Sequence, residues 1–177
     1  MQFTQRIDDE LELAFLQMSM AEEFKQLVDD NREYLSQWMP WTKDANTLAD
    51  TEKFIKDSIA GFKDQKTINV VIVYNGKIVG ITGYNSILPE VKKVAIGYWL
   101  AAECQGKGIM TRCVKYLIQN AFDNMGMEKV EIEAAVENKL SRAVIERVGG
   151  TLEGIIKNAE NLHGKIVDHA VYGVYKA

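Results

Sequence analysis

Apolar and polar positions alternate along the 177-residue chain in patterns that are typical of short strands and helices. Every second position is apolar from Leu11 to Phe15, which indicates a first strand. Ser19 followed by Glu22 predicts a capped helix start, and Thr47 followed by Asp50 predicts a second one over residues 47–63. The inward face of that second helix is expected to carry Leu48, Phe54, Ile55, Ile59 and Phe62.

The middle and the end of the chain favour strands separated by two helices. Residues 68–74 and 77–84 flank Asn75-Gly76, a strong signal for a hairpin. A third strand is expected up to residue 100, then a helix over 111–124, a strand over 130–136 and a helix over 138–148. Residues 151–159 and 166–175 are expected to close the fold as a hairpin. The order predicts one α/β (α+β) domain over residues 1–177, with a mixed, mostly antiparallel sheet flanked by helices.

Composition and charge exclude several classes of function. The net charge is −4 and no block of basic residues is present, which argues against direct binding to nucleic acid. No stretch of 18 apolar residues exists and the first eleven residues are polar, so we expect no membrane span and a cytoplasmic location. Two cysteines, Cys104 and Cys113, and two histidines lack the spacing of a metal site, so no metal is expected.

Residues 105–111 carry the most informative motif in the chain, Gln-Gly-Lys-Gly-Ile-Met-Thr. Two glycines two positions apart let the backbone curl between an expected strand and an expected helix. The N–H groups of such a loop, together with the helix dipole, form a seat for phosphate oxygens. The loop lacks the third glycine of a dinucleotide fingerprint and the Gly-Lys-Ser/Thr ending of a P-loop. Glycines that serve helix packing alone remain the alternative interpretation.

With Gln105, Gly108 and Met110 at its fixed positions, the loop resembles the Gln/Arg-x-x-Gly-x-Gly/Ala motif of the Gcn5-related N-acetyltransferase superfamily. In that superfamily the motif wraps the pyrophosphate of acetyl-CoA through backbone amides. Met110 departs from the pattern, since it is neither glycine nor alanine. The resemblance implies acetyl-CoA as co-substrate and a cofactor loop made of Gln105, Gly106, Lys107, Gly108, Ile109, Met110 and Thr111.

The resemblance extends to both sides of the loop. Residues 94–100 are similar to the family strand that splays from its neighbour, here 129–137, and admits the pantetheine arm of acetyl-CoA. Open backbone groups of Trp99, Leu100 and Ala101 would then pair with that arm. Asn138 and Ser141 resemble the Asn-x-x-Ser segment that begins the next helix, where Asn138 holds the arm or the wedge. Simple helix capping is the alternative for these two residues.

Residues 35–41 and 153–169 are similar to segments of the Rim-type acetyltransferases, which modify the amino termini of ribosomal proteins. The resemblance implies that Trp38 and Trp41 line the acceptor side of the cleft, whereas core packing is the alternative for both. It further implies a possible homodimer. The reaction implied is direct attack of an amine on the thioester, with no nucleophile from the protein.

The resemblance implies Glu160 as the general base, and the alternative is a solvated turn glutamate. Ser141 is expected to protonate the departing thiolate or to hold a group near it. Tyr98 and Tyr172 are the backup candidates. His163 and His169 are expected to be turn and strand residues rather than catalysts. Many relatives carry a glutamate where this chain has Ala95, so that candidate base is absent.

The expected acceptor is an α-amine, because the site offers one weakly placed carboxylate. At pH 7 roughly a tenth to a fifth of α-amines are neutral, against about one lysine amine in 2,500. A protein N-terminus is therefore the preferred acceptor. A small amine, such as a polyamine or an antibiotic, and a catalytically silent acyl-CoA-binding domain remain the alternatives.

Overall fold

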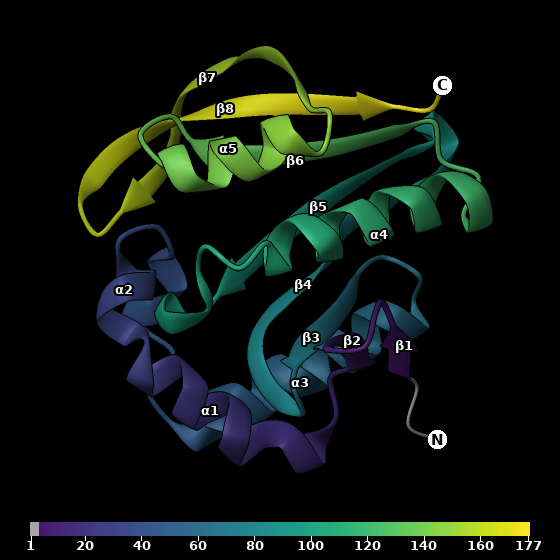
Figure 1. The fold of residues 1–177 in the computed structure, drawn as a ribbon. Helices are drawn as coiled ribbons and strands as arrows, with labels where there is room; N and C mark the ends of the chain where they lie inside the picture. The colour runs from purple at the N-terminus through teal and green to yellow at the C-terminus, as the bar shows by residue number, and fades with distance from the viewer. Residues whose placement is uncertain (1–3) are drawn as a thin grey trace.

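A computed structural model describes residues 4–177 and contains one eight-stranded sheet with five α-helices. The strands are β1 (Thr4–Arg6), β2 (Leu11–Phe15), β3 (Ile68–Tyr74), β4 (Lys77–Leu88), β5 (Lys93–Leu100), β6 (Lys129–Ala135), β7 (Thr151–Leu162) and β8 (Lys165–Tyr175). The α-helices are α1 (Ala21–Asp30), α2 (Arg32–Ser36), α3 (Leu48–Lys63), α4 (Ile109–Asn124) and α5 (Lys139–Arg147). The sheet order is β1-β2-β3-β4-β5-β6-β8-β7, and every neighbouring pair except β5 and β6 is antiparallel (Figure 1).

The parallel pair β5 and β6 is joined over only part of its length. Ladder partners run from Lys93 with Lys129 to Ile96 with Ile132, and no ladder pair follows although β5 continues to Leu100. Figure 1 shows the two strands diverging beyond this point. The expected splay is therefore confirmed, and it leaves an opening in the middle of the sheet.

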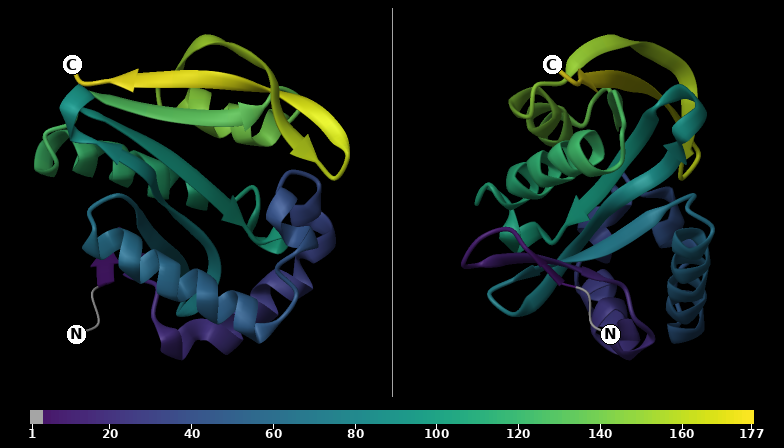
Figure 2. Two further views of the ribbon diagram at one scale, coloured as in Figure 1. Left: turned by 180° about the vertical axis from the view of Figure 1, so that it is seen from behind. Right: turned by 90° about the vertical axis from the view of Figure 1, so that its right-hand side faces the viewer.

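Helices cover both faces of the sheet, with α1 to α3 on one face and α4 with α5 on the other (Figure 2). Side chains alternate between the two faces along each strand. On β5, Val94, Ile96 and Leu100 enter the core under α4, whereas Trp99 enters the core under α1 and α3. The strand that borders the opening is thus anchored from both sides.

The capping box of Thr47 and Asp50 is confirmed, whereas the predicted start at Ser19 and Glu22 is wrong. Ser19 lies inside a 3-10 turn over Met18–Met20, so α1 begins at Ala21 without a side-chain cap. The expected inward face of α3 is only partly buried: Ile55 is fully buried, whereas Phe54 stacks on Phe24 and Phe62 packs against Phe15 without being covered. The apolar side chains of α3 that remain at least a third exposed are Leu48, Phe54, Ile59 and Phe62.

Other boundaries differ from the expected ones in ways that shape the site. Helix α4 begins at Ile109, two residues before the expected start, directly after Gly108. Strands β7 and β8 extend until only His163 and Gly164 separate them, both at positive φ, which gives a two-residue hairpin turn. The short edge strand β1 was not predicted. The long hairpin lies beside α2, and the His163 ring contacts the carbonyl oxygen of Ser36 at 3.0 Å.

Candidate active site

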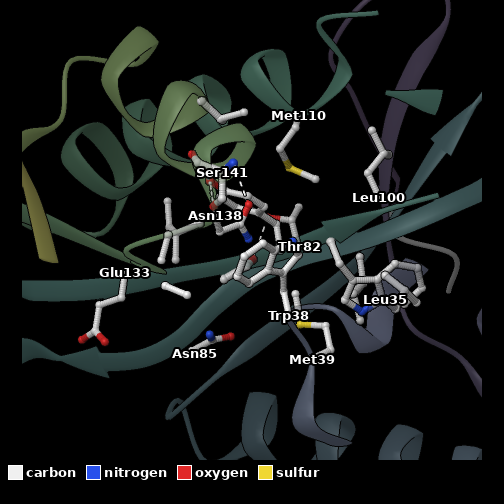
Figure 3. A pocket seen from close by; sticks show the side chains of 18 of the residues that line it. Leu35, Trp38, Met39, Thr82, Asn85, Leu100, Met110, Glu133, Asn138 and Ser141 are labelled. Carbon is white, nitrogen blue, oxygen red and sulfur yellow. Dashed lines mark hydrogen bonds between the residues drawn. The ribbon is translucent and has the colours of Figure 1, made fainter. Parts of the chain in front are cut away.

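A cavity of about 650 Å³ lies where β5 and β6 part, bordered by the α2 segment and by the β7–β8 hairpin. Figure 3 shows Asn138 and Ser141 on the α5 side of this cavity and Trp38 with Met39 on the opposite side. Aromatic and aliphatic side chains such as Trp38, Trp41, Ile96 and Leu100 line much of it, which suits an acyl group. The site residues expected from the sequence that line it are Trp38, Trp41, Trp99, Leu100, Gln105, Met110, Asn138, Ser141 and Glu160.

The backbone of β5 beside the opening is only partly free. The Ala101 N–H donates to the Val79 carbonyl at 2.8 Å, and Trp99 pairs with Ile81 of β4, so the expectation of open backbone groups is wrong for Ala101 and Trp99. The Leu100 carbonyl accepts from Gln105 Nε2 at 3.3 Å, a bond that ties the loop to the strand. Backbone groups alternate in direction along a strand, so those of Tyr98 and Leu100 face the opening and those of Trp99 and Ala101 face β4.

The glycines of the loop serve backbone conformation rather than packing. Gly106 has φ +74° and Gly108 has φ +69°, the left-handed region that glycine enters at little cost. A Cβ at either position would meet no protein atom within 4 Å. The space in front of the loop is therefore open, and Gly108 is the N-cap of α4. The first N–H groups of a helix have no partner within it, so those at the start of α4 can serve a ligand as donors.

Positive side chains and the Met110 side chain complete the surroundings of the loop. Arg147 of α5 donates from Nη1 to Thr111 Oγ1 at 3.2 Å, which brings a guanidinium beside the first turn of α4. Lys107 is exposed on the loop itself. Met110 is buried in the core under α4 and reaches the cavity wall, so the larger side chain fits without blocking the open side of the loop.

Asn138, Ser141 and Tyr98 form a hydrogen-bonded group at the start of α5. Asn138 caps the helix by accepting from the Ser141 N–H at 3.2 Å, and both side chains also line the cavity, so capping and a site role coexist. The Tyr98 hydroxyl lies 3.1 Å from Ser141 Oγ. Burial raises the pKa of Tyr98 to about 12, and the bond with Ser141 offsets part of that rise. Tyr98 is therefore a neutral proton donor at physiological pH.

Tyr172 is not available as a backup donor. Its hydroxyl accepts from Arg142 Nε at 2.8 Å and lies 3.2 Å from Glu146 Oε1, and it is absent from the cavity lining. The ring is 1% exposed. Tyr172 therefore holds α5 against β8.

Glu160 faces the cavity next to two residues that sequence reasoning did not select for chemistry. His169 Nε2 lies 3.4 Å from Glu160 Oε2, and His169 Nδ1 lies 3.2 Å from Glu133 Oε2. All three side chains line the cavity. The chain has no carboxylate at position 95 of β5, where Ala95 pairs with Glu131 of β6. Side chains alternate along a strand, so Glu133 lies on the same face of β6 as Glu131. This face therefore carries a carboxylate on β6 in place of one at residue 95.

Aromatic side chains line the opposite side of the cavity. Trp41 packs against Trp99 with ring centroids 6.1 Å apart and also lines the cavity, so core packing and a cavity role are combined. Trp38 is half-buried at the same wall. Asn85 was missed: it sits in a bulge of β4, and its amide would lie 2.1 Å from a Cβ at Gly97. Glycine at 97 is what lets this amide cross β5 toward the cavity.

Both cysteines are free and buried. Burial raises the pKa of the Cys113 thiol to about 12 and also raises that of Cys104. Neither thiol is a thiolate at neutral pH, and neither lines the cavity. Across residues 4–177, no group of three or more histidine, cysteine or acidic side chains is arranged to hold a metal ion. The same residues contain no helix that is both long and apolar enough to span a membrane.

The family model for the acetyltransferase (GNAT) domain matches residues 11–151. The chain belongs to the GNAT acetyltransferase family. A putative ribosomal N-acetyltransferase of Bacillus subtilis (strain 168), YdaF, is 31% identical over 98% of this chain and 96% of its own length.

Two solved acetyltransferase structures superpose closely on this chain. The microcin C7 self-immunity acetyltransferase MccE, in complex with acetyl-CoA and AMP, is 34% identical with a TM-score of 0.93, covering 96% of this chain and 94% of MccE. RimL, a ribosomal L7/L12 α-N-protein acetyltransferase in complex with coenzyme A, is 28% identical with a TM-score of 0.94, covering 98% of each chain. The chain is therefore an acetyl-CoA-dependent N-acetyltransferase.

The residues of this GNAT chain fit acetyl-CoA. A curled loop with open space before its amides can hold a pyrophosphate, with Lys107 and Arg147 near it. The opening between β5 and β6 leads from that loop into the cavity, where Leu100 and Ser141 lie.

Proposed function

We propose that this enzyme acetylates the α-amine at the N-terminus of a protein, with a ribosomal protein as the expected acceptor in the cytoplasm. The observation that carries the proposal is that Glu160 and Ser141 line one cavity at the opening between β5 and β6. Full-length similarity to RimL, an α-N-protein acetyltransferase, supports the class of acceptor.

Acetyl-CoA supplies an activated acyl group, and the chain's own residues bind, orient and move protons. Amides of residues 105–111 hold the pyrophosphate, and the β5 backbone at Tyr98 and Leu100 binds the arm that enters the opening. Glu160 accepts the proton of the attacking amine. Ser141, backed by the neutral Tyr98 hydroxyl, supplies a proton to the departing sulfur.

The acceptor amine is expected to enter between the aromatic wall and Glu160. Trp38 and Trp41 lie on the α2 side of the cavity, and Glu160 comes from the hairpin that borders it. An α-amine is neutral often enough at pH 7 for a single carboxylate to complete its deprotonation. A negative net charge also favours the approach of a positively charged N-terminus.

The test is an acetylation assay by mass spectrometry with three acceptors. These are a peptide with a free α-amine and no lysine, the same peptide with a blocked N-terminus and one added lysine, and spermidine. The proposal predicts acetyl transfer to the first peptide at a kcat/KM at least about tenfold above the others, since their amines are mostly charged at pH 7. Preference for spermidine or for the lysine would contradict it.

A small-molecule amine is the second candidate acceptor, and one observation favours it. MccE, a self-immunity acetyltransferase whose structure contains AMP, is 34% identical to this chain. An aromatic wall with Trp38 and Trp41 accepts a flat ring as readily as a peptide. An aminoacyl nucleotide added to the assay above as a fourth acceptor distinguishes the two candidates.

A further inference from the structure

His169 occupies an unusual position between two carboxylates from two other strands. It lies on β8, with Glu133 of β6 at its Nδ1 and Glu160 of β7 at its Nε2, 3.2 Å and 3.4 Å away. The His169 side chain is 18% exposed, that of Glu160 27% and that of Glu133 40%. Solvent access therefore increases from His169 through Glu160 to Glu133, and burial decreases in the same order.

Proton counting shows what this arrangement can do. A neutral imidazole carries one N–H and can donate to one carboxylate, whereas an ionised carboxylate only accepts. The Nδ1 contact with Glu133 has hydrogen-bond geometry, and the longer Nε2 contact does not. With one proton on the ring, a lone pair of Nε2 faces the Glu160 carboxylate. One further proton placed between them turns this contact into a hydrogen bond.

We propose that Glu160, His169 and Glu133 act as one proton-accepting unit, an inference that rests on the proposed function of Glu160. Glu133 accepts from Nδ1–H and so turns Nε2 toward Glu160. Glu160 takes the proton from the acceptor ammonium and shares it with Nε2 of His169. The Nδ1 proton then passes to Glu133 and from there to water, so each transfer breaks one bond to hydrogen and forms one.

The ion pair of Asp168 with Lys157 on the same two strands is separate from this unit. Asp168 precedes His169 but is ion-paired with Lys157 at 2.8 Å on the outside of the hairpin, and the Lys157 bond lowers the pKa of Asp168. Lys157 is 80% exposed and does not line the cavity. This pair lies on the same two strands, so Lys157 offers a matched control site.

The kinetic test compares His169→Gln, Glu133→Gln and Lys157→Gln with the wild-type enzyme, using the acceptor that it acetylates. Glutamine at 169 keeps a polar side chain but cannot take up a proton. We expect kcat to fall at least about tenfold for His169→Gln and severalfold for Glu133→Gln, with the KM for acetyl-CoA unchanged. Lys157→Gln should match the wild type. Imidazole added to His169→Ala should restore part of the lost kcat.

A second measurement needs no turnover and separates this inference from the proposed function. Nitrogen-15 NMR of the two histidines of the wild-type protein, assigned with His163→Gln, reports which ring nitrogen carries the proton. The proposal predicts that Nδ1 of His169 carries the proton in the wild-type protein. In Glu133→Gln this tautomer should no longer be the dominant form. A wild-type ring protonated on Nε2 alone overturns the proposal, as does a His169→Gln enzyme with kcat within twofold of wild type. Failure of every acceptor, with Nδ1–H observed, overturns the proposed function and leaves this arrangement standing.

Discussion

The hydroxyl of Tyr98 on β5 lies 3.1 Å from the hydroxyl of Ser141 on α5. This bond links the strand that borders the opening to the helix beyond it, at the point where β5 and β6 no longer pair. Ser141 was expected as the proton donor and Tyr98 as a backup. The contact places the two hydroxyls in series, so that the more acidic phenol of Tyr98 can return a proton to Ser141 after Ser141 has donated one.

Loss of either hydroxyl should slow the delivery of a proton to the leaving sulfur. Ser141→Ala and Tyr98→Phe are each expected to lower kcat by about ten- to a hundredfold, with the double variant no slower than the worse single one. Tyr175→Phe, which removes an exposed hydroxyl on β8, is the control. Steady-state kinetics check this. A double variant whose loss of kcat equals the product of the two single losses would show that the two hydroxyls act independently.

Removal of the proposed base should affect turnover and spare acetyl-CoA binding. Glu160→Gln is expected to lower kcat about a hundredfold at pH 7. The deficit should shrink as the pH passes ~8, because the α-amine of the acceptor is then mostly neutral. A pH profile of kcat/KM with an α-amine peptide checks this. A variant as active as the wild type from pH 6 to 9 would remove Glu160 from the mechanism.

A side chain at Gly108 should weaken acetyl-CoA binding, because its Cβ would project into the open space before the loop. The glycine has φ +69°, and Gly126, far from the loop in the sequence, has the same φ and equally open surroundings. Gly108→Val and Gly126→Val should therefore carry similar backbone strain. Calorimetry should show at least about a tenfold higher Kd, or 1.4 kcal/mol, for the first alone. Equal affinity in both variants would mean that the loop does not approach the phosphates.

Alkaline pH should destabilise the fold. Burial raises the pKa of Tyr84 and Tyr98 from 10 to about 12 and that of Cys113 from 9 to about 12. Between those limits the folded protein holds protons that the unfolded chain has lost, so the free energy of unfolding falls as pH rises. Urea unfolding should show full stability below pH 9 and a decline toward pH 12. Tyr84→Phe should reduce the slope above pH 10, and stability that rises above pH 9 would contradict the account.

The sequence predicted the parts of this fold that depend on local pattern. Alternation, the Asn75-Gly76 turn and the Thr47 capping box placed most elements, and the spacing of Gly106 and Gly108 indicated the loop. The helix start predicted at Ser19 was wrong because a 3-10 turn precedes the helix, and no local pattern specifies that turn. The inward face of α3 is less buried than expected, because apolar spacing shows which residues share a helix face and not how much of that face a sheet covers.

The part of the site that sequence reasoning missed depends on strand pairing. Glu133, Glu160 and His169 lie on three strands whose order in the sheet, β6-β8-β7, differs from their order in the chain. Only the register that pairs Ala135 with His169 brings these side chains together. Nothing in one sequence could show that a histidine from β8 would lie beside Glu133. The contact between Arg147 of α5 and Thr111 of α4 was missed for the same reason, because one sequence does not show which helices lie side by side.

The most direct test of the central claim is a titration of the nitrogen-15-labelled protein with coenzyme A, followed through its backbone amide resonances. The account predicts the largest shifts at residues 105–111 and at 96–100, with little change on α3, because the loop grips the pyrophosphate and the pantetheine arm runs along β5. Saturation without perturbation of those two segments, or the absence of any binding, would contradict it.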